Sequence, residues 1–178
     1  MQLFYNSTID KNTLQITFDK IESRHIVKVL RKKEGDAIYI TNGKGQVFNC
    51  KITIANDKKC LVSILGKEEK KQFKDYYLHV AIAPTKNNDR LEWFIEKATE
   101  IGIDEITPII CQNSERKIIK KERLEKIIVA AMKQSLKFYL PKLNEAVSFS
   151  EFLKKKQKGD IYIAHCEESE KKYLKSVI

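Results

Sequence analysis

The spacing of apolar residues changes partway along this 178-residue chain, and that change constrains the fold more than any other feature. From Phe48 to Ile54, apolar and polar residues alternate, which is the period of a strand with one buried face. The dipeptide Asn42-Gly43 just before this stretch accepts positive φ and indicates a tight turn. Short strands joined by such turns predict a small β-barrel, which we place at residues 1–70.

A different pattern begins after the polar stretch at residues 68–75. We expect strands at residues 77–83, 106–111 and 161–166, with helices at about 91–101, 120–139 and 150–156 between them. Alternating strands and helices predict a parallel α/β sheet, here over residues 75–178. In such sheets, ligands bind beyond the carboxyl ends of the strands.

One helix interrupts the first part, at about residues 22–32, and its apolar stripe is predicted at Ile26, Val29 and Leu30. The opposite face carries the candidate RNA-binding residues Arg24, Lys28, Arg31 and Lys32. His25 is a further candidate, which either contacts RNA or caps and packs locally. Cations at this spacing suit the phosphates of a nucleic acid. An ordinary solvated helix face is the alternative.

The overall charge favours a polyanionic partner, because 34 Lys and Arg stand against 24 Asp and Glu, a net charge of +10. No apolar stretch is long enough for a membrane-spanning helix, and the first residues do not resemble a secretory signal. The four cysteines lack metal-ligand spacing, so we expect no metal site and free thiols in a cytoplasmic protein.

Charged residues also follow the predicted strands of the second part. Lys86 comes after the first strand, and Arg116 follows the second, so both are expected at one edge of the sheet. Glu96, Lys97 and Glu100 lie on one predicted helix face, either as a functional cluster or as surface charge. These residues alone do not form a complete active site.

Several longer blocks carry a family resemblance. HIVKVLRKKEGD and TNGKGQVF, followed by RLEWFIEKATEIGIDEITPI, SERK and AAMKQSLKFYLPKL, resemble in order and spacing the RsmE family. Members of this family are 16S ribosomal RNA (uracil-N3)-methyltransferases of the SPOUT class. The resemblance extends from about Phe4 to the end of the chain.

The resemblance implies a PUA-like RNA-binding barrel, followed by a SPOUT-type α/β domain. It implies methyl transfer from S-adenosylmethionine to N3 of a uridine in 16S ribosomal RNA of the small subunit, by a homodimer. Methylation requires removal of the N3 proton, and cations beside the pyrimidine oxygens favour the resulting anion. Arg116 and Lys86 are our candidates for that electrostatic role.

Two departures from the family pattern change these expectations. Leu136 stands where the family motif E-Q-S-G-R has glycine, and the family's G-P-E-G-G loop does not occur before Ile178. The resemblance therefore implies that the knot segment is missing and that the S-adenosylmethionine site lies mainly beyond Ile178. The alternative function is a non-catalytic RNA-binding protein.

Overall fold

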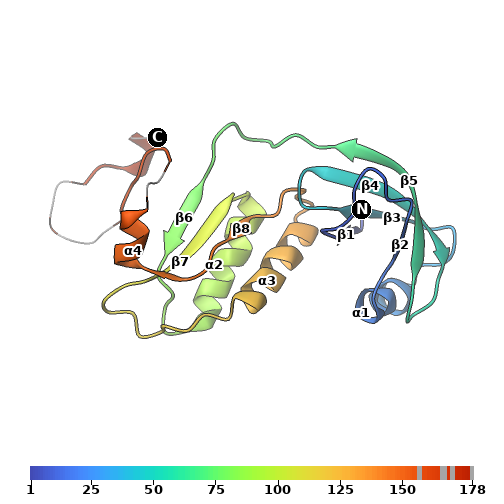
Figure 1. Cartoon of the computed structure of the whole chain (residues 1–178), viewed down its shortest axis with the longest axis horizontal. Helices are drawn as coiled ribbons and strands as arrows, with labels where there is room; N and C mark the ends of the chain where they lie inside the picture. Colours follow the sequence, from blue (N-terminus) through green and yellow to red (C-terminus); the bar gives the residue numbers. More distant parts are fainter. Residues whose placement is uncertain (156–157, 165–167, 169–170, 177–178) are drawn as a thin grey trace.

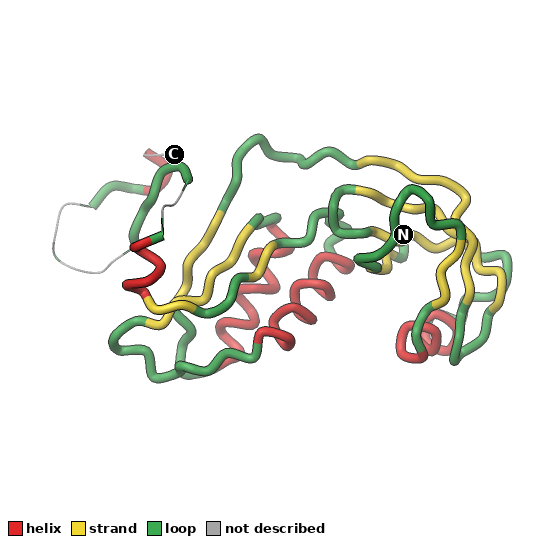
Figure 2. Tube along the Cα trace, in the orientation of Figure 1, coloured by secondary structure: helices red, strands yellow, loops and turns green. Residues whose placement is uncertain are grey.

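The computed structural model describes residues 1–155, 158–164, 168 and 171–176. Two β-sheets lie along an elongated molecule, helices pack beside each of them, and α4 with the C-terminal segment lies beyond the second sheet (Figure 1). The chain passes from the first sheet to the second along an extended segment, as the tube in Figure 2 shows. The change of apolar period in the sequence therefore corresponds to a change from one sheet to the other.

The N-terminal sheet has five strands in the order β1-β3-β4-β5-β2. The strands are β1 (Leu3–Tyr5), β2 (Gln15–Thr17), β3 (Ala37–Thr41), β4 (Gln46–Ile54) and β5 (Leu61–Glu69). Only β1 and β3 are parallel, and two shifts of register between β4 and β5 help to bend the sheet. The predicted barrel is thus a curled, open sheet, or half-barrel, around a core that includes Phe4, Phe48 and Ile52.

The helix that carries the basic residues is short and irregular. In α1 (Lys20–Arg24), the Asp19 carboxylate accepts a hydrogen bond from the backbone N–H of Glu22 at 2.8 Å. The chain continues as a π-helical turn, η1 (His25–Val29), in which the backbone N–H of Leu30 donates to the carbonyl oxygen of His25. The turn is therefore wider than the regular α-helix that the apolar spacing predicted.

This wider turn changes which side chains face the core. Ile26 is buried as predicted, but the prediction for Val29 is wrong, because its side chain is 68% exposed. Val27 and Leu30 are partly buried and pack against the same core as Ile26. The side-chain pattern follows the π-helical backbone rather than the α-helical period.

The second sheet is parallel, as predicted, and its strands are β6 (His79–Ile82), β7 (Glu105–Ile110), β8 (Lys142–Leu143) and β9 (Val147–Ser148). Helices α2 (Asn88–Ile101) and α3 (Lys121–Gln134) pack on one face. The core between helices and sheet contains Leu91, Ile95, Ile106, Leu124 and Ile128. The short strands β8 and β9 have too few residues for a recognisable period.

Two sequence predictions in this part are wrong. α3 ends at Gln134 rather than near Tyr139, and Leu136 adopts the left-handed conformation with φ 53°. Residues 161–164, part of the predicted third strand, are not in a strand, and residues 165–166 lie outside the described residues.

The predicted short helix is confirmed as α4 (Phe149–Lys154), with a capping box between Ser148 and Glu151. A short 3₁₀ turn, η2 (Leu174–Ser176), follows.

Candidate functional site

The predicted phosphate-binding residues lie together on α1, η1 and the turn that follows. Arg24, Lys28 and Arg31 are exposed, whereas His25 and Lys32 are partly buried. The Nδ1 atom of His25 lies 3.7 Å from a carboxylate oxygen of Glu22, and its ring contacts Phe4 edge-on. Three of the five residues therefore point into solvent, and His25 also has a local packing role.

The backbone of this segment is unusual at two points. The π-helical turn spans residues 25–29, and Arg31 has φ 53°, which is rare for a residue with a side chain. Both features are frequent at functional sites. The Nζ atom of Lys28 lies 3.8 Å from a carboxylate oxygen of Asp57, but both side chains are exposed, so this ion pair is weak. The predicted RNA-binding role of this surface remains a prediction.

The loops that carry Lys86 and Arg116 meet at the carboxyl edge of β6 and β7. The Nη2 and Nε atoms of Arg116 donate to the backbone carbonyl oxygen of Lys86, at 3.1 and 3.3 Å. The ammonium group of Lys86 lies 3.2 Å from a carboxylate oxygen of Glu115, and these two side chains are 83% and 64% exposed. The edge thus gathers charge, but Arg116 is engaged in holding one loop against the other.

The acidic pair on α2 is bridged by a lysine. Nζ of Lys97 lies 2.8 Å from Glu96 Oε1 and 3.0 Å from Glu100 Oε1. The hydrogen bond with Glu96, followed by that with Glu100, raises the pKa of Lys97. A cation between two like charges removes their repulsion, so this cluster is explained as surface charge.

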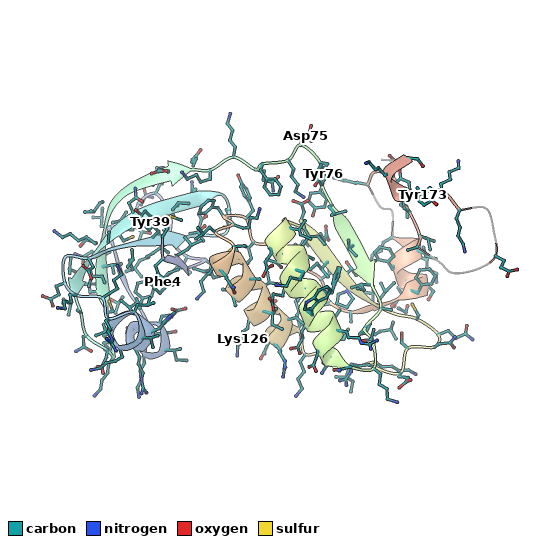
Figure 3. The ribbon with its side chains drawn as sticks, turned by 180° about the vertical axis from the view of Figure 1, so that it is seen from behind. Phe4, Tyr39, Asp75, Tyr76, Lys126 and Tyr173 are labelled. Carbon is teal, nitrogen blue, oxygen red and sulfur yellow. The ribbon has the colours of Figure 1, made fainter. Side chains whose placement is uncertain are left out.

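A surface groove of about 820 Å³ runs beside α3. Its lining residues are mostly charged: Glu92, Lys120, Lys121, Glu122, Arg123, Lys126, Ile127 and Ala130. A second groove of about 480 Å³ lies along the same helix, and Glu22 and Lys133 are among its lining residues. Neither groove is lined by Lys86 or Arg116. Figure 3 labels Lys126, which lines both.

A polar network that sequence reasoning missed lies at the amino ends of the parallel strands. Glu105 accepts hydrogen bonds from the Tyr77 hydroxyl at 2.6 Å, the Asn144 amide at 2.6 Å and the Lys142 ammonium at 2.9 Å. Asn144 also donates to the hydroxyl of Thr107, which lies 2.7 Å from Nε2 of His79. The available signal was a carboxylate directly before the predicted strand at residues 106–111, with a threonine two positions later.

The network shifts the acidity of its members. Burial alone would raise the pKa of Glu105, but the hydrogen bonds from Tyr77, Asn144 and Lys142 outweigh it and lower this pKa to about 2. Burial, with the hydrogen bond to Glu105, raises the pKa of Tyr77 to about 12. Burial also lowers the pKa of His79. Since ligands of parallel sheets bind at the opposite edge, we interpret this network as structural.

Two further features concern the described part of the chain as a whole. No helix in it has both the length and the apolar character needed to span a membrane. Within the same residues, His, Cys, Asp and Glu side chains do not gather in threes or more at a position suited to a metal ion.

The described chain joins a half-barrel, whose helical segment exposes Arg24, Lys28 and Arg31, to a parallel α/β sheet. Comparisons with known families assign these two parts to a class of RNA-modifying proteins. Residues 71–177 match the RNA methyltransferase domain, and residues 18–65 match the RNA methyltransferase PUA domain. The chain belongs to the RNA methyltransferase family whose curated members are named ribosomal RNA small subunit methyltransferase E.

Relatives of known name support this membership. The ribosomal RNA small subunit methyltransferase E of Bacillus subtilis strain 168 is 32% identical over 167 residues, which are 89% of this chain and 63% of that protein. The protein of the same name from Rickettsia conorii is 30% identical over 177 residues, 98% of this chain and 70% of that protein. The chain therefore spans roughly two thirds of the length of these relatives.

Solved structures show the same fold. A probable rRNA-methyltransferase from Porphyromonas gingivalis superposes with a TM-score of 0.82 at 36% identity, covering 93% of this chain and 70% of that one. A ribosomal RNA small subunit methyltransferase E from Neisseria gonorrhoeae, bound to S-adenosyl methionine, superposes with a TM-score of 0.79 at 20% identity. That match covers 89% of this chain and 67% of the other.

The loops at the carboxyl edge of β6 and β7 expose several polar side chains. Thr85, Lys86 and Asn87 in one loop are exposed, as are Gln112 and Asn113 in the next. Small-molecule sites are concave and bury most of the ligand, so these five side chains do not bury a cofactor in their present positions.

Proposed function

We propose that this protein acts in the S-adenosylmethionine-dependent methylation of N3 of a uridine in 16S ribosomal RNA. The observation that carries the proposal is the pairing of an RNA methyltransferase domain with a PUA domain whose helix presents exposed Arg24, Lys28 and Arg31. The names of the Bacillus subtilis and Rickettsia conorii relatives support the ribosomal substrate. Cofactor use is supported by the Neisseria gonorrhoeae structure.

The chemistry assigns separate tasks to Lys86 and Arg116. At neutral pH, N3 of uracil carries a proton, which must pass to water or to a general base before the uracil anion attacks a methyl group. The exposed ammonium of Lys86 supplies positive charge for a developing oxyanion on the pyrimidine. Arg116 positions Lys86 by holding its backbone carbonyl, rather than by contacting RNA itself.

We also propose roles for the two parts of the chain, together with its oligomeric state, location and partner. Residues 1–70 act as the RNA-binding unit, and residues 75–178 belong to the methyltransferase unit. The protein acts as a homodimer in the cytoplasm, where its partner is the small ribosomal subunit or its RNA. These statements rest on the family and on the charge of the chain, since residues 1–74 carry 15 Lys and Arg against 8 Asp and Glu.

Disruption of the gene in its source organism tests the proposal. Mass spectrometry of nucleosides from 16S RNA should show that 3-methyluridine is lost, and that the wild-type gene restores it. The variant with Arg24, Lys28 and Arg31 changed to Ala should restore it poorly, because it lacks the proposed phosphate contacts. Unchanged 3-methyluridine after disruption would instead favour a non-catalytic RNA-binding protein.

A further inference from the structure

The two sheets are held together by a short backbone pairing. The turn at residues 42–46 lies antiparallel to residues 138–140, which follow α3. The N–H of Gly45 donates to the carbonyl oxygen of Phe138, and the N–H of Leu140 donates to that of Gly43, both at 2.8 Å. We call these two segments the joint.

The joint is closely packed as well as hydrogen-bonded. Gly45 has φ 85°, and a Cβ atom there would lie 2.3 Å from the hydroxyl oxygen of Tyr139. That hydroxyl donates to the carbonyl oxygen of Lys70 at 2.9 Å, where the chain leaves β5. A residue larger than glycine at position 45 is therefore incompatible with Tyr139 in its present place.

An ion pair connects the same two parts at a second point. Nζ of Lys133 on α3 lies 2.9 Å from a carboxylate oxygen of Glu22 on α1. Both side chains are mostly buried, with exposures of 23% and 29%. Lys133 also lies over the ring of Phe4 in β1, at 6.0 Å from its centroid. Glu22 belongs to the cationic helix, so the pair links that helix to α3, which packs on the second sheet.

The connecting segment is also anchored. Nζ of Lys74 forms an ion pair with Asp104, and these side chains are only 4% and 6% exposed. Asp104 accepts a further hydrogen bond from the N–H of Leu78 at 2.6 Å. Asp75 and Tyr76, labelled in Figure 3, lie on this segment between the sheets. Residues 70–78 therefore connect the sheets without acting as a loose linker.

This arrangement places two candidate surfaces on one side of the molecule. In Figure 1, the carboxyl ends of β6 and β7 point to the lower side of the view, where α1 also lies. We propose that the joint is a positioning device, which keeps the cationic helix and the carboxyl edge at a fixed orientation so that one rRNA contacts both. This inference rests on the proposed function.

The test compares a joint variant with a matched control. The joint variant combines Glu22→Gln with Tyr139→Ala, which removes the ion pair and the packing at Gly45. The control combines Glu145→Gln with Tyr173→Ala, which removes another Lys–Glu pair and a tyrosine that is 88% exposed. Both variants gain one positive charge, so a loss of RNA affinity cannot come from lost charge.

Three measurements follow on the same proteins. Amide hydrogen exchange at Gly45 and Leu140 should become faster in the joint variant, because these N–H groups donate across the joint. Affinity for a 16S RNA transcript should fall about tenfold. When the cationic helix and the carboxyl edge move independently, binding at one no longer holds the RNA close to the other. Affinity for hexauridylate, chosen to occupy one surface only, should change less than about twofold.

Two other results would show that the joint does not position the two RNA-binding surfaces. Faster exchange with unchanged affinity for the transcript, or an equal loss for both RNAs, would overturn the inference. If the amides stay protected, Gly45→Ala provides a second variant that must displace Tyr139, and the same readouts apply. If the wild-type chain does not bind the transcript, the proposed function is wrong. The inference about the joint is then wrong as well, because it depends on that function.

Discussion

The guanidinium of Arg116 lies 3.1 Å from the backbone carbonyl oxygen of Lys86, although thirty residues separate them in sequence. Both residues follow parallel strands, so the sheet brings their loops to the same edge. The contact joins the two residues that sequence reasoning placed at this edge. The guanidinium of Arg116 thereby holds the Lys86 backbone, while the Lys86 side chain is 83% exposed and pairs with Glu115.

We expect the 178-residue chain to bind S-adenosylmethionine negligibly. Thr85, Lys86, Asn87, Gln112 and Asn113 at the carboxyl edge are exposed, so these side chains do not bury an adenine ring or exclude water from it. Isothermal titration calorimetry tests this, with the S-adenosylmethionine-binding protein of Neisseria gonorrhoeae as positive control. Micromolar binding to the 178-residue chain would contradict it.

Replacing Arg24, Lys28 and Arg31 by Ala should weaken binding to a 16S RNA transcript. Each lost phosphate contact should reduce the slope of log K against log salt by about 1. The buried Ile26 is untouched, so the melting temperature should change little. A control in which the exposed Lys154, Lys158 and Lys172 are changed to Ala should keep most of the slope. Equal losses in both variants would indicate a diffuse positive field and an ordinary solvated helix.

Leu136→Gly should stabilise the protein by about 1 kcal/mol, because Leu136 has φ 53° and only glycine adopts that conformation without strain. Urea unfolding measures this change. Leu153→Gly in α4 is the matched control, and it should destabilise the protein by about 1 kcal/mol or more. A loss of stability in Leu136→Gly would mean that the packing of the leucine outweighs the strain.

The stability of the protein should decrease in acid partly because of Glu105. Its folded pKa of about 2 lies below the ordinary value of 4.5, so the unfolded state binds a proton more readily. The ionised Glu105 carboxylate contributes its full stabilisation above its ordinary pKa. That contribution is lost as the pH falls from about 5 towards 2. The size expected for such a carboxylate is about 2 kcal/mol.

Urea unfolding at pH 6 and pH 3.5 measures the contribution of Glu105. Glu105→Gln should lower stability at pH 6 and show a weaker dependence on pH, because the amide does not titrate. Glu145→Gln, at a mostly exposed carboxylate, should follow the wild type. The same dependence on pH in wild type and Glu105→Gln would assign the acid sensitivity to other groups.

Sequence reasoning succeeded where short-range patterns decide structure. The alternation from Phe48 to Ile54 identified β4, and the strand–helix order identified the parallel sheet. It failed at Val29, because a π-helical turn replaced the regular helix, and at Tyr139, because the chain leaves α3 early to pair with the turn near Gly45. At Tyr139, pairing with a distant turn outweighed the local pattern, whereas at Val29 the backbone itself departs from the α-helical period.

The sequence by itself determined the two fold classes, the cationic helix and the edge at which Lys86 and Arg116 lie. Period, turn residues and charge depend on neighbours within a few positions, so they can be read along the chain. Only the tertiary structure decided the environment of Glu105, the ion pair of Glu22 with Lys133 and the joint at Gly45 and Tyr139. These contacts join residues about 30 to 110 positions apart, and hydrogen bonding and close packing select them only when the sheets and helices assemble.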